Sequence, residues 1–188
     1  MLFRSFFSNA LSESSGSLVT NANLISKVYF PRMIVPAGAV IVGFVDFLIS
    51  FVIMAALMVW YGFMPGIQIL TLPLWVGLAF LAAIGPGLFI TALNVKYRDF
   101  RYVIPFVVQF GLYISPVGFR SDVVPEQWRL LYSLNPMVGV IDGFRWCIGA
   151  EPSLHVGALA ISVVTAVILF GLGIRFFRQT EKGFADVI

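Results

Sequence analysis

The sequence predicts an all-α protein, a polytopic bundle of transmembrane helices with short amphipathic or re-entrant helices between the spans. Of its 188 residues, 60% are hydrophobic and only 11% are charged, whereas about 25% are charged in ordinary soluble domains. The mean hydropathy is +0.96, and the apolar residues gather in long blocks, as membrane spans require. The alternating pattern of membrane β-strands is absent. Helices are therefore the expected form, because they pair every backbone polar group internally.

Four segments are predicted to span the membrane within a single permease-sized domain, residues 1–188. They run approximately over residues 33–61, 69–93, 103–117 and 154–174, and the third is shorter than the others. A hydrocarbon core of about 30 Å takes about 20 helical residues to cross. The remaining parts are residues 1–32, an outer segment at 118–153 and a tail at 175–188.

The charge distribution predicts the orientation of the spans. Nine of the twelve basic residues lie in the three regions that share one side if there are four spans. They are Arg4, Lys27, Arg32, Lys96, Arg98, Arg101, Arg175, Arg178 and Lys182. Basic residues concentrate on the cytoplasmic side of membrane proteins. We expect a multi-pass protein of a plasma membrane with both ends in the cytoplasm, in contact with lipids and not with nucleic acid.

Residues 1–32 contain two features that precede the first span. Leu2, Phe3, Phe6, Phe7 and Leu11 form an apolar stretch too short to span, which is either the end of a preceding helix or an interfacial anchor. Residues 17–32 predict a short amphipathic helix at the membrane surface, stopped by Pro31. It is either a docking surface for a cytoplasmic partner or a connector with its apolar face on lipid.

Asp46 lies near the middle of the first span. A carboxylate at this depth costs about 2.5–3.5 kcal/mol on insertion scales, so we expect it to face protein or water rather than lipid. It is either part of a polar transport path or a paired acid packed between helices. One acid by itself is not a proton relay.

The loop after the second span is short and highly charged. Lys96, Tyr97, Arg98 and Asp99 are read either as anchors in the lipid headgroups or as a second cytoplasmic contact.

The outer segment at 118–153 predicts two short helices. Pro116 disrupts the end of the third span, and Asn135-Pro136 is a cap-and-start signal for a helix that Gly149 would end. Trp128 lies on one face of the preceding helix, while Asp142 and Arg145 lie three residues apart. The pair is either a gate at the external mouth or two interfacial helices.

Several chemistries are missing from the sequence. Cys147 and His155 are the only cysteine and histidine, so no Cys/His metal site is expected. No lysine follows a glycine, so there is no phosphate-binding loop of the Walker type. No nucleophile–base or paired-carboxylate set stands out. We expect no enzyme activity and no cofactor bound by this chain.

The chain resembles the permease subunit of polysaccharide-exporting ABC transporters, the family that exports O-antigen, capsule and teichoic acid. The matching stretches are residues 21–32, 45–47, 93–101, 115–116, 134–137 and the tail at 178–188, in order along nearly the whole chain. The family has six spans, so the chain resembles it without the amino-terminal span and a half, which is an amino-terminal truncation.

The resemblance implies a homodimer that exports a lipid-linked glycan across the bacterial inner membrane, with two copies of a separate cytoplasmic ATPase that bind the ATP. By the same resemblance, a coupling helix that fits the ATPase carries Asn23, Leu24, Lys27, Tyr29 and Arg32. The external gate region carries Pro116, Trp128, Asn135, Pro136, Asp142 and Arg145. The alternatives are an ABC permease for a drug or small lipid, and a membrane-embedded enzyme or structural subunit.

Overall fold

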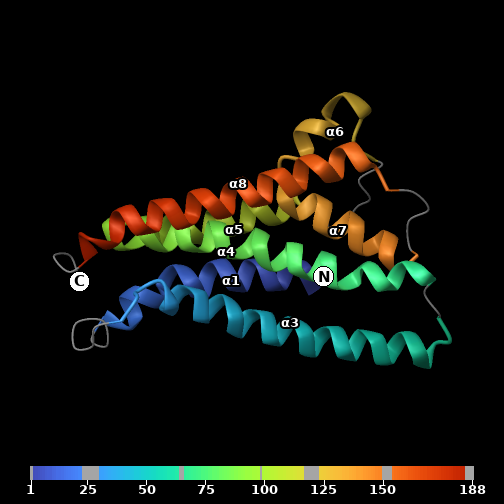
Figure 1. The fold of residues 1–188 in the computed structure, drawn as a ribbon, viewed down its shortest axis with the longest axis horizontal. Helices are drawn as coiled ribbons and strands as arrows, with labels where there is room; N and C mark the ends of the chain where they lie inside the picture. Colours follow the sequence, from blue (N-terminus) through green and yellow to red (C-terminus); the bar gives the residue numbers. More distant parts are fainter. Residues whose placement is uncertain are drawn as a thin grey trace.

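The computed structural model describes residues 2–22, 30–63, 66–97, 99–116, 123–149 and 154–184. Helices packed side by side in an elongated bundle make up this part of the chain (Figure 1). In chain order they are α1 (Leu2–Thr20), α3 (Ile34–Trp60), the 3-10 helix η1 (Ile67–Thr71), α4 (Leu72–Lys96), α5 (Phe100–Ile114), α6 (Glu126–Tyr132), α7 (Pro136–Cys147) and α8 (Val156–Glu181). The described ranges contain no strand, so the all-α prediction is confirmed.

Three helical segments of the described chain are long and apolar enough to cross a membrane. They are α3, η1 together with α4 (Ile67–Lys96), and α8. At 1.5 Å per residue, the 27 residues of α3 extend about 40 Å. The predicted third span lies differently from expectation, because α5 begins at Phe100 and ends at Ile114, before Pro116. With 15 residues α5 is short for a span, so the four-span topology stays a prediction.

The amino-terminal helix α1 differs most from expectation. It continues for 19 residues, so Ser17 and Leu18 belong to its end and not to a separate surface helix. Both residues are buried in the bundle. Phe3 and Phe6 are also buried, in contact with α3 and α7, so the reading as an interfacial anchor is wrong. The remainder of the predicted surface helix, residues 23–29, lies outside the described residues.

Helix α4 lies at the centre of the bundle, in contact with α1, α3, α7 and α8. Its closest neighbour is α8, and glycine makes this approach possible. A Cβ atom added to Gly85 would lie 2.7 Å from the Cα of Phe170, and one added to Gly173 would overlap the carbonyl oxygen of Gly85. Small residues allow membrane helices to pack backbone against backbone in this way.

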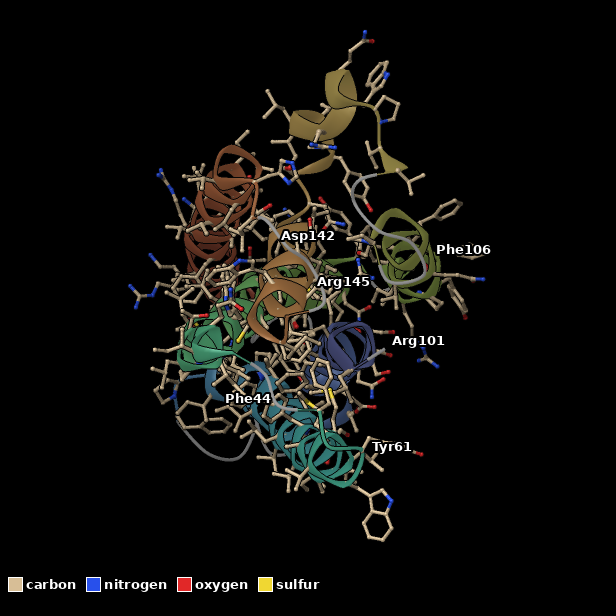
Figure 2. The ribbon with its side chains drawn as sticks, turned by 90° about the vertical axis from the view of Figure 1, so that its right-hand side faces the viewer. Phe44, Tyr61, Arg101, Phe106, Asp142 and Arg145 are labelled. Atoms are coloured by element: carbon tan, nitrogen blue, oxygen red, sulfur yellow. The ribbon has the colours of Figure 1, made fainter. Side chains whose placement is uncertain are left out.

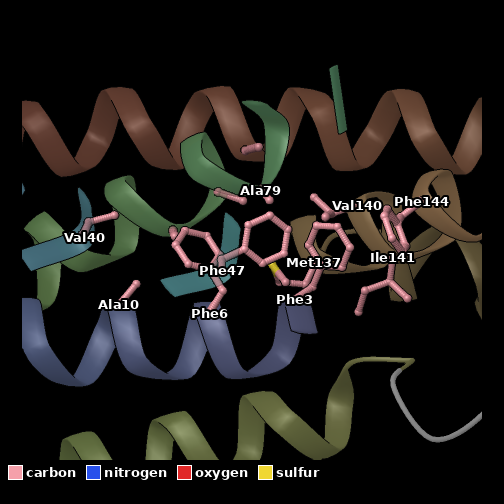
Figure 3. Close-up of a cluster of buried hydrophobic side chains, with 13 residues drawn as sticks. Phe3, Phe6, Ala10, Val40, Phe47, Ala79, Met137, Val140, Ile141 and Phe144 are labelled. Carbon is pink, nitrogen blue, oxygen red and sulfur yellow. The ribbon is translucent and has the colours of Figure 1, made fainter. Parts of the chain in front are cut away.

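A cluster of buried apolar side chains joins α1, α3, α4 and α7 (Figure 3). Phenylalanine rings form much of it. The Phe3 ring lies 4.9 Å from that of Phe47 on α3 and 4.6 Å from that of Phe144 on α7. Aromatic pairs contribute about 0.5–1.5 kcal/mol beyond the area they bury, so these rings fix α1 against both neighbours.

The two ends of the bundle differ in charge. At one end, on the left of Figure 1, α1, α4 and α8 finish and α3 and α5 begin. This end, called the basic end below, carries Arg32, Lys96, Arg101, Arg175, Arg178 and Lys182 among the described residues. Helices α6 and α7 lie toward the opposite end, and α6 projects away from the bundle.

Candidate functional site

The segment that leads into α3 is held to the last turn of α8 at the basic end. The backbone N–H of Arg32 donates to Glu181 Oε1 at 3.2 Å, and Arg32 Nη1 donates to the Glu181 carbonyl oxygen at 3.0 Å. A cation on the last carbonyls of a helix also complements the helix dipole. Arg32 therefore has a structural attachment to α8 in addition to any role in docking.

A second buried cluster holds both flanks of the predicted coupling segment. Leu18 at the end of α1 packs with residues of α4 and α8, and Phe30 and Met33 lie against the same cluster. Its other buried members are Leu88, Ala92, Val95, Phe177 and Phe184. The chain therefore leaves and re-enters the bundle beside the ends of α4 and α8. The predicted docking residues Asn23, Leu24, Lys27 and Tyr29 lie outside the described residues.

Hydrogen bonds from α4 fasten α1 along a polar seam. Thr91 Oγ1 donates to the Ser14 carbonyl oxygen at 2.8 Å, and Asn94 Nδ2 donates to the Ser15 carbonyl oxygen at 2.8 Å. Thr91 and Asn94 are buried. Bonds between membrane helices contribute on average about 0.6 kcal/mol and up to about 1.7. The seam fixes the rotation of α1 about its axis.

This rotation turns a polar stripe of α1 away from the bundle. Ser5, Asn9, Ser12 and Glu13 are exposed, and their spacing puts them on one face of a helix. Helix α1 lies between α3 and α5, and Figure 2 shows Arg101 of α5 beside the outward side of α1. Polar side chains thus face outward where neighbouring helices of the same chain do not cover them.

Asp46 of α3 borders this stripe. Its side chain is exposed, so it is not an acid packed between the described helices. The centre of the Phe44 ring lies 5.2 Å from that of Phe80 on α4. Asp46 follows Phe44 by two residues, which is a rotation of about 200° around the helix. Asp46 therefore lies on the side of α3 away from α4. It follows that Asp46 and the polar stripe of α1 border the same outward surface.

The charged loop between α4 and α5 is exposed at the basic end. Lys96, Tyr97 and Asp99 are all exposed, and the Lys96 ammonium lies 5.3 Å from the centre of the Tyr97 ring. This arrangement suits either a headgroup anchor or a cytoplasmic contact. Arg98 lies outside the described residues.

Helix α7 is buried on nearly every side. Its cap is confirmed: Asn135 Oδ1 accepts from the Met137 N–H at 3.0 Å, and Pro136 occupies the first turn. Asn135 Nδ2 also donates to Ser115 Oγ at 3.1 Å, beside the buried Pro116, which joins the start of α7 to the end of α5. A Cβ atom added to Gly143 would overlap the ring of Trp75 on α4. Helix α7 is therefore packed inside the bundle and does not lie on its surface.

The two short helices differ in their surroundings. Trp128 of α6 is 59% exposed, and Leu130 and Leu131 on the same helix are 58% exposed, whereas α7 fills the space between α4 and α8. Burial, together with the charge of Asp142, raises the pKa of Tyr132 from 10.0 to about 12 against the opposing effect of Arg145. Asp142 and Arg145 of α7, labelled in Figure 2, therefore act electrostatically on Tyr132, the last residue of α6.

Sequence reasoning missed the seam and the glycine crossing. The signal that could have found them is the recurrence of small residues, with Ala10, Ser14 and Ser17 on α1 and Gly87 and Thr91 on α4. Metal chemistry finds no support in the described ranges, where no three His, Cys, Asp or Glu residues lie close enough to hold an ion.

Comparison with known proteins finds a family and several similar proteins. The model of the ABC-2 type transporter family matches residues 1–148. Two proteins of Klebsiella pneumoniae and one of Myxococcus xanthus, all described as O-antigen export system permease protein RfbA, are similar to the chain. Their identities are 25%, 24% and 22%, and each match covers 97% of this chain and 71% of the relative.

Proposed function

Because the chain belongs to the ABC-2 type transporter family, we propose that it is the transmembrane subunit of an ABC exporter for a lipid-linked polysaccharide. The cargo class is that of O-antigen, capsule or teichoic acid, carried across the bacterial inner membrane. The names of the similar proteins support this cargo. The chain performs no chemistry of its own and serves as the permease.

The ATPase of the exporter is a separate cytoplasmic subunit that docks at the basic end. ATP binds to that subunit, since this chain has no phosphate-binding loop. Support comes from the convergence of α1, α3, α4 and α8 at the points where the chain leaves α1 and enters α3. The connection between these points carries Asn23, Leu24, Lys27 and Tyr29. A shift of this segment would act directly on α1 and, through Arg32 and Glu181, on α8. The orientation of this end toward the cytoplasm follows from its charge.

The cargo passes along the outward polar face of α1, which a second copy of the chain encloses in a homodimer. The observation that carries this proposal is the exposed stripe of Ser5, Asn9, Ser12 and Glu13, bordered by Asp46. Such groups in a membrane line a water-filled path or meet another protein surface. A glycan is hydroxyl-rich, so its transfer requires polar walls of this kind.

Helix α7 and the residues around it form the external gate. Phe3 at the start of α1 touches Phe144 of α7 at 4.6 Å, and Leu18 near the other end of α1 packs in the cluster that Phe30 and Met33 also contact. A single helix therefore reaches from the ATPase side to α7. This contact supports a gate role for α7 more than for the projecting α6.

The proposal is tested by reconstituting the full-length exporter with its ATPase in vesicles and measuring ATP-dependent transfer of lipid-linked glycan. We expect Glu13→Leu combined with Asp46→Leu to lower transfer by about tenfold or more, which corresponds to about 1.4 kcal/mol. Both side chains are exposed, so the fold and ATPase binding stay intact. Leu48→Ala, at an exposed site on the other side of α3, is the matched control and leaves transfer unchanged.

Unchanged transfer in the double variant would show that the polar face of α1 is not the passage. A wild-type complex that hydrolyses ATP but moves another cargo in place of the glycan would refute the cargo assignment. Docking is tested separately with Lys27→Glu, which leaves α1 whole. Retention of the ATPase at wild-type affinity by this variant would contradict the coupling role of Lys27.

A further inference from the structure

A groove on the outer surface of α8 at the basic end has no part in the proposed passage. Its volume is about 610 Å³, and its walls come from about three turns of α8, between Phe170 and Lys182. Helix α4 packs against α1 on one side and α8 on another, and Figure 2 shows α1 and α8 on opposite sides of α7. The groove therefore faces away from the polar stripe of α1.

Three cations line the half of the groove nearer the end of α8. Arg175, Arg178 and Lys182 follow each other at intervals of three and four residues, so they share one face of the helix. All three are exposed. The carboxylate of Glu181 on the same turn accepts the Arg32 N–H, and in the described part of the chain no acidic group pairs with the three cations. The groove thus carries positive charge that is not neutralised there.

The half of the groove farther from the end of α8 is apolar. It is formed by Phe170, Gly171 and Ile174, one to two turns before the cations. A Cβ atom added to Gly171 would meet nothing within 4 Å, so the missing side chain leaves open space above Arg175. Arg178 follows Gly171 by seven residues, a distance of about 10 Å along the helix axis. The separation between the charged and the apolar part of the groove thus matches the distance between a lipid headgroup and the start of its acyl chain.

We propose that this groove binds one anionic membrane phospholipid. Its phosphate lies among Arg175, Arg178 and Lys182, and an acyl chain lies over Phe170, Gly171 and Ile174. Charge complementarity selects an anionic headgroup, because basic side chains at a membrane surface bind acidic lipids. The apolar half selects a lipid rather than a free phosphate ion. The position on the outer face of α8 selects a bulk membrane lipid rather than the cargo that passes on the side of α1.

The site is tested by native mass spectrometry of the purified full chain in detergent micelles titrated with phosphatidylglycerol or phosphatidylcholine. We expect one phosphatidylglycerol to stay bound at concentrations where phosphatidylcholine does not. Each basic residue near an anionic lipid contributes about fivefold in affinity. The triple variant Arg175→Gln, Arg178→Gln and Lys182→Gln should therefore bind roughly a hundredfold more weakly. Lys96→Gln with Arg101→Gln removes charge from the same end outside the groove and should bind normally.

A second pair of variants tests the apolar half without a change of charge. Gly171→Leu fills the open space and should weaken phosphatidylglycerol binding by about tenfold, the loss expected when roughly two buried methylenes are displaced. Gly157→Leu, also at an exposed glycine of α8 with nothing within 4 Å, is the matched control. Equal affinity of the triple variant and the wild type would overturn the site. Tighter binding of a polyprenyl phosphate than of phosphatidylglycerol would overturn the assignment to a phospholipid.

Discussion

The crossing of α4 and α8 gives a sharp test of the packing, because two glycines two residues apart on α8 have opposite surroundings. A Cβ atom on Gly173 would overlap the Gly85 carbonyl oxygen and lie 2.9 Å from its carbon. A Cβ atom on Gly171 would meet nothing within 4 Å. The obstacle at Gly173 is backbone on both helices, so no side chain can rotate to make room. Only a separation of the two helices would admit the extra atom.

The expected magnitudes follow from this difference. Overpacking costs about 1–3 kcal/mol, and Gly173→Ala belongs at the upper end, about 3 kcal/mol, because backbone must move. Gly171→Ala gains up to about 1 kcal/mol from the higher helix propensity of alanine. The two variants should differ by roughly 4 kcal/mol in the free energy of unfolding. At about 2–4 °C per kcal/mol, their midpoints of thermal unfolding should differ by about 8–16 °C.

The assay is unfolding of each purified variant in the same detergent, followed by far-ultraviolet circular dichroism, with denaturant titration in mixed micelles as a second measurement. Gly85→Ala should resemble Gly173→Ala, because its added carbon would lie 2.7 Å from the Phe170 backbone. Equal stability of Gly171→Ala and Gly173→Ala would refute the reasoning, since it would mean that α4 and α8 do not cross at these glycines.

Two further predictions concern the region of α6 and α7. The Tyr132 phenol should titrate near pH 12, which is measured as the difference in phenolate absorbance between the wild type and Tyr132→Phe. Because the pKa is raised in the folded state, the neutral phenol contributes its full stability below pH 10, and this contribution is lost as the pH rises through 12. A difference titration centred at pH 10 would contradict this. Asn135→Ala should lower the free energy of unfolding by about 1 kcal/mol or slightly more, because it removes the α7 cap and the bond to Ser115. Asn135→Asp keeps a capping oxygen and should recover most of this loss. An Asn135→Asp variant no more stable than Asn135→Ala would argue against the cap.

Local signals in the sequence were sufficient to predict features that depend on the residue type at a single position. Asn135 caps α7 through its side-chain oxygen as predicted, and Gly149 follows the helix with φ of 76°, a conformation that favours glycine. The long apolar blocks likewise appear as α3, α4 and α8. These features depend on length, hydropathy and capping, which the sequence states directly.

The position of α1 could not be read from hydropathy. Its buried face contains Ser14, Ser15 and Ser17, and serine has a low score on any scale that measures transfer to hydrocarbon. In a membrane, small polar residues promote helix contact because they permit close approach and hydrogen bonding. The helix is therefore defined by its fit to Gly87, Thr91 and Asn94 of α4. That fit is a property of the pair and not of either segment.

The energetics of an exposed acid decide which face of the bundle can meet lipid. Asp46 is exposed near the middle of α3, and a carboxylate placed at the bilayer centre costs about 2.5–3.5 kcal/mol. That cost is a large part of the whole stability of many proteins, about 5–15 kcal/mol. The face of α3 that carries Asp46 must therefore be covered by water or by protein when the chain lies in its membrane. The outer surface of α8 carries its charge only in its last two turns, at the depth of the headgroups, and pays no such penalty. The chain thus has one face that lipid cannot cover without this cost and another face that it can.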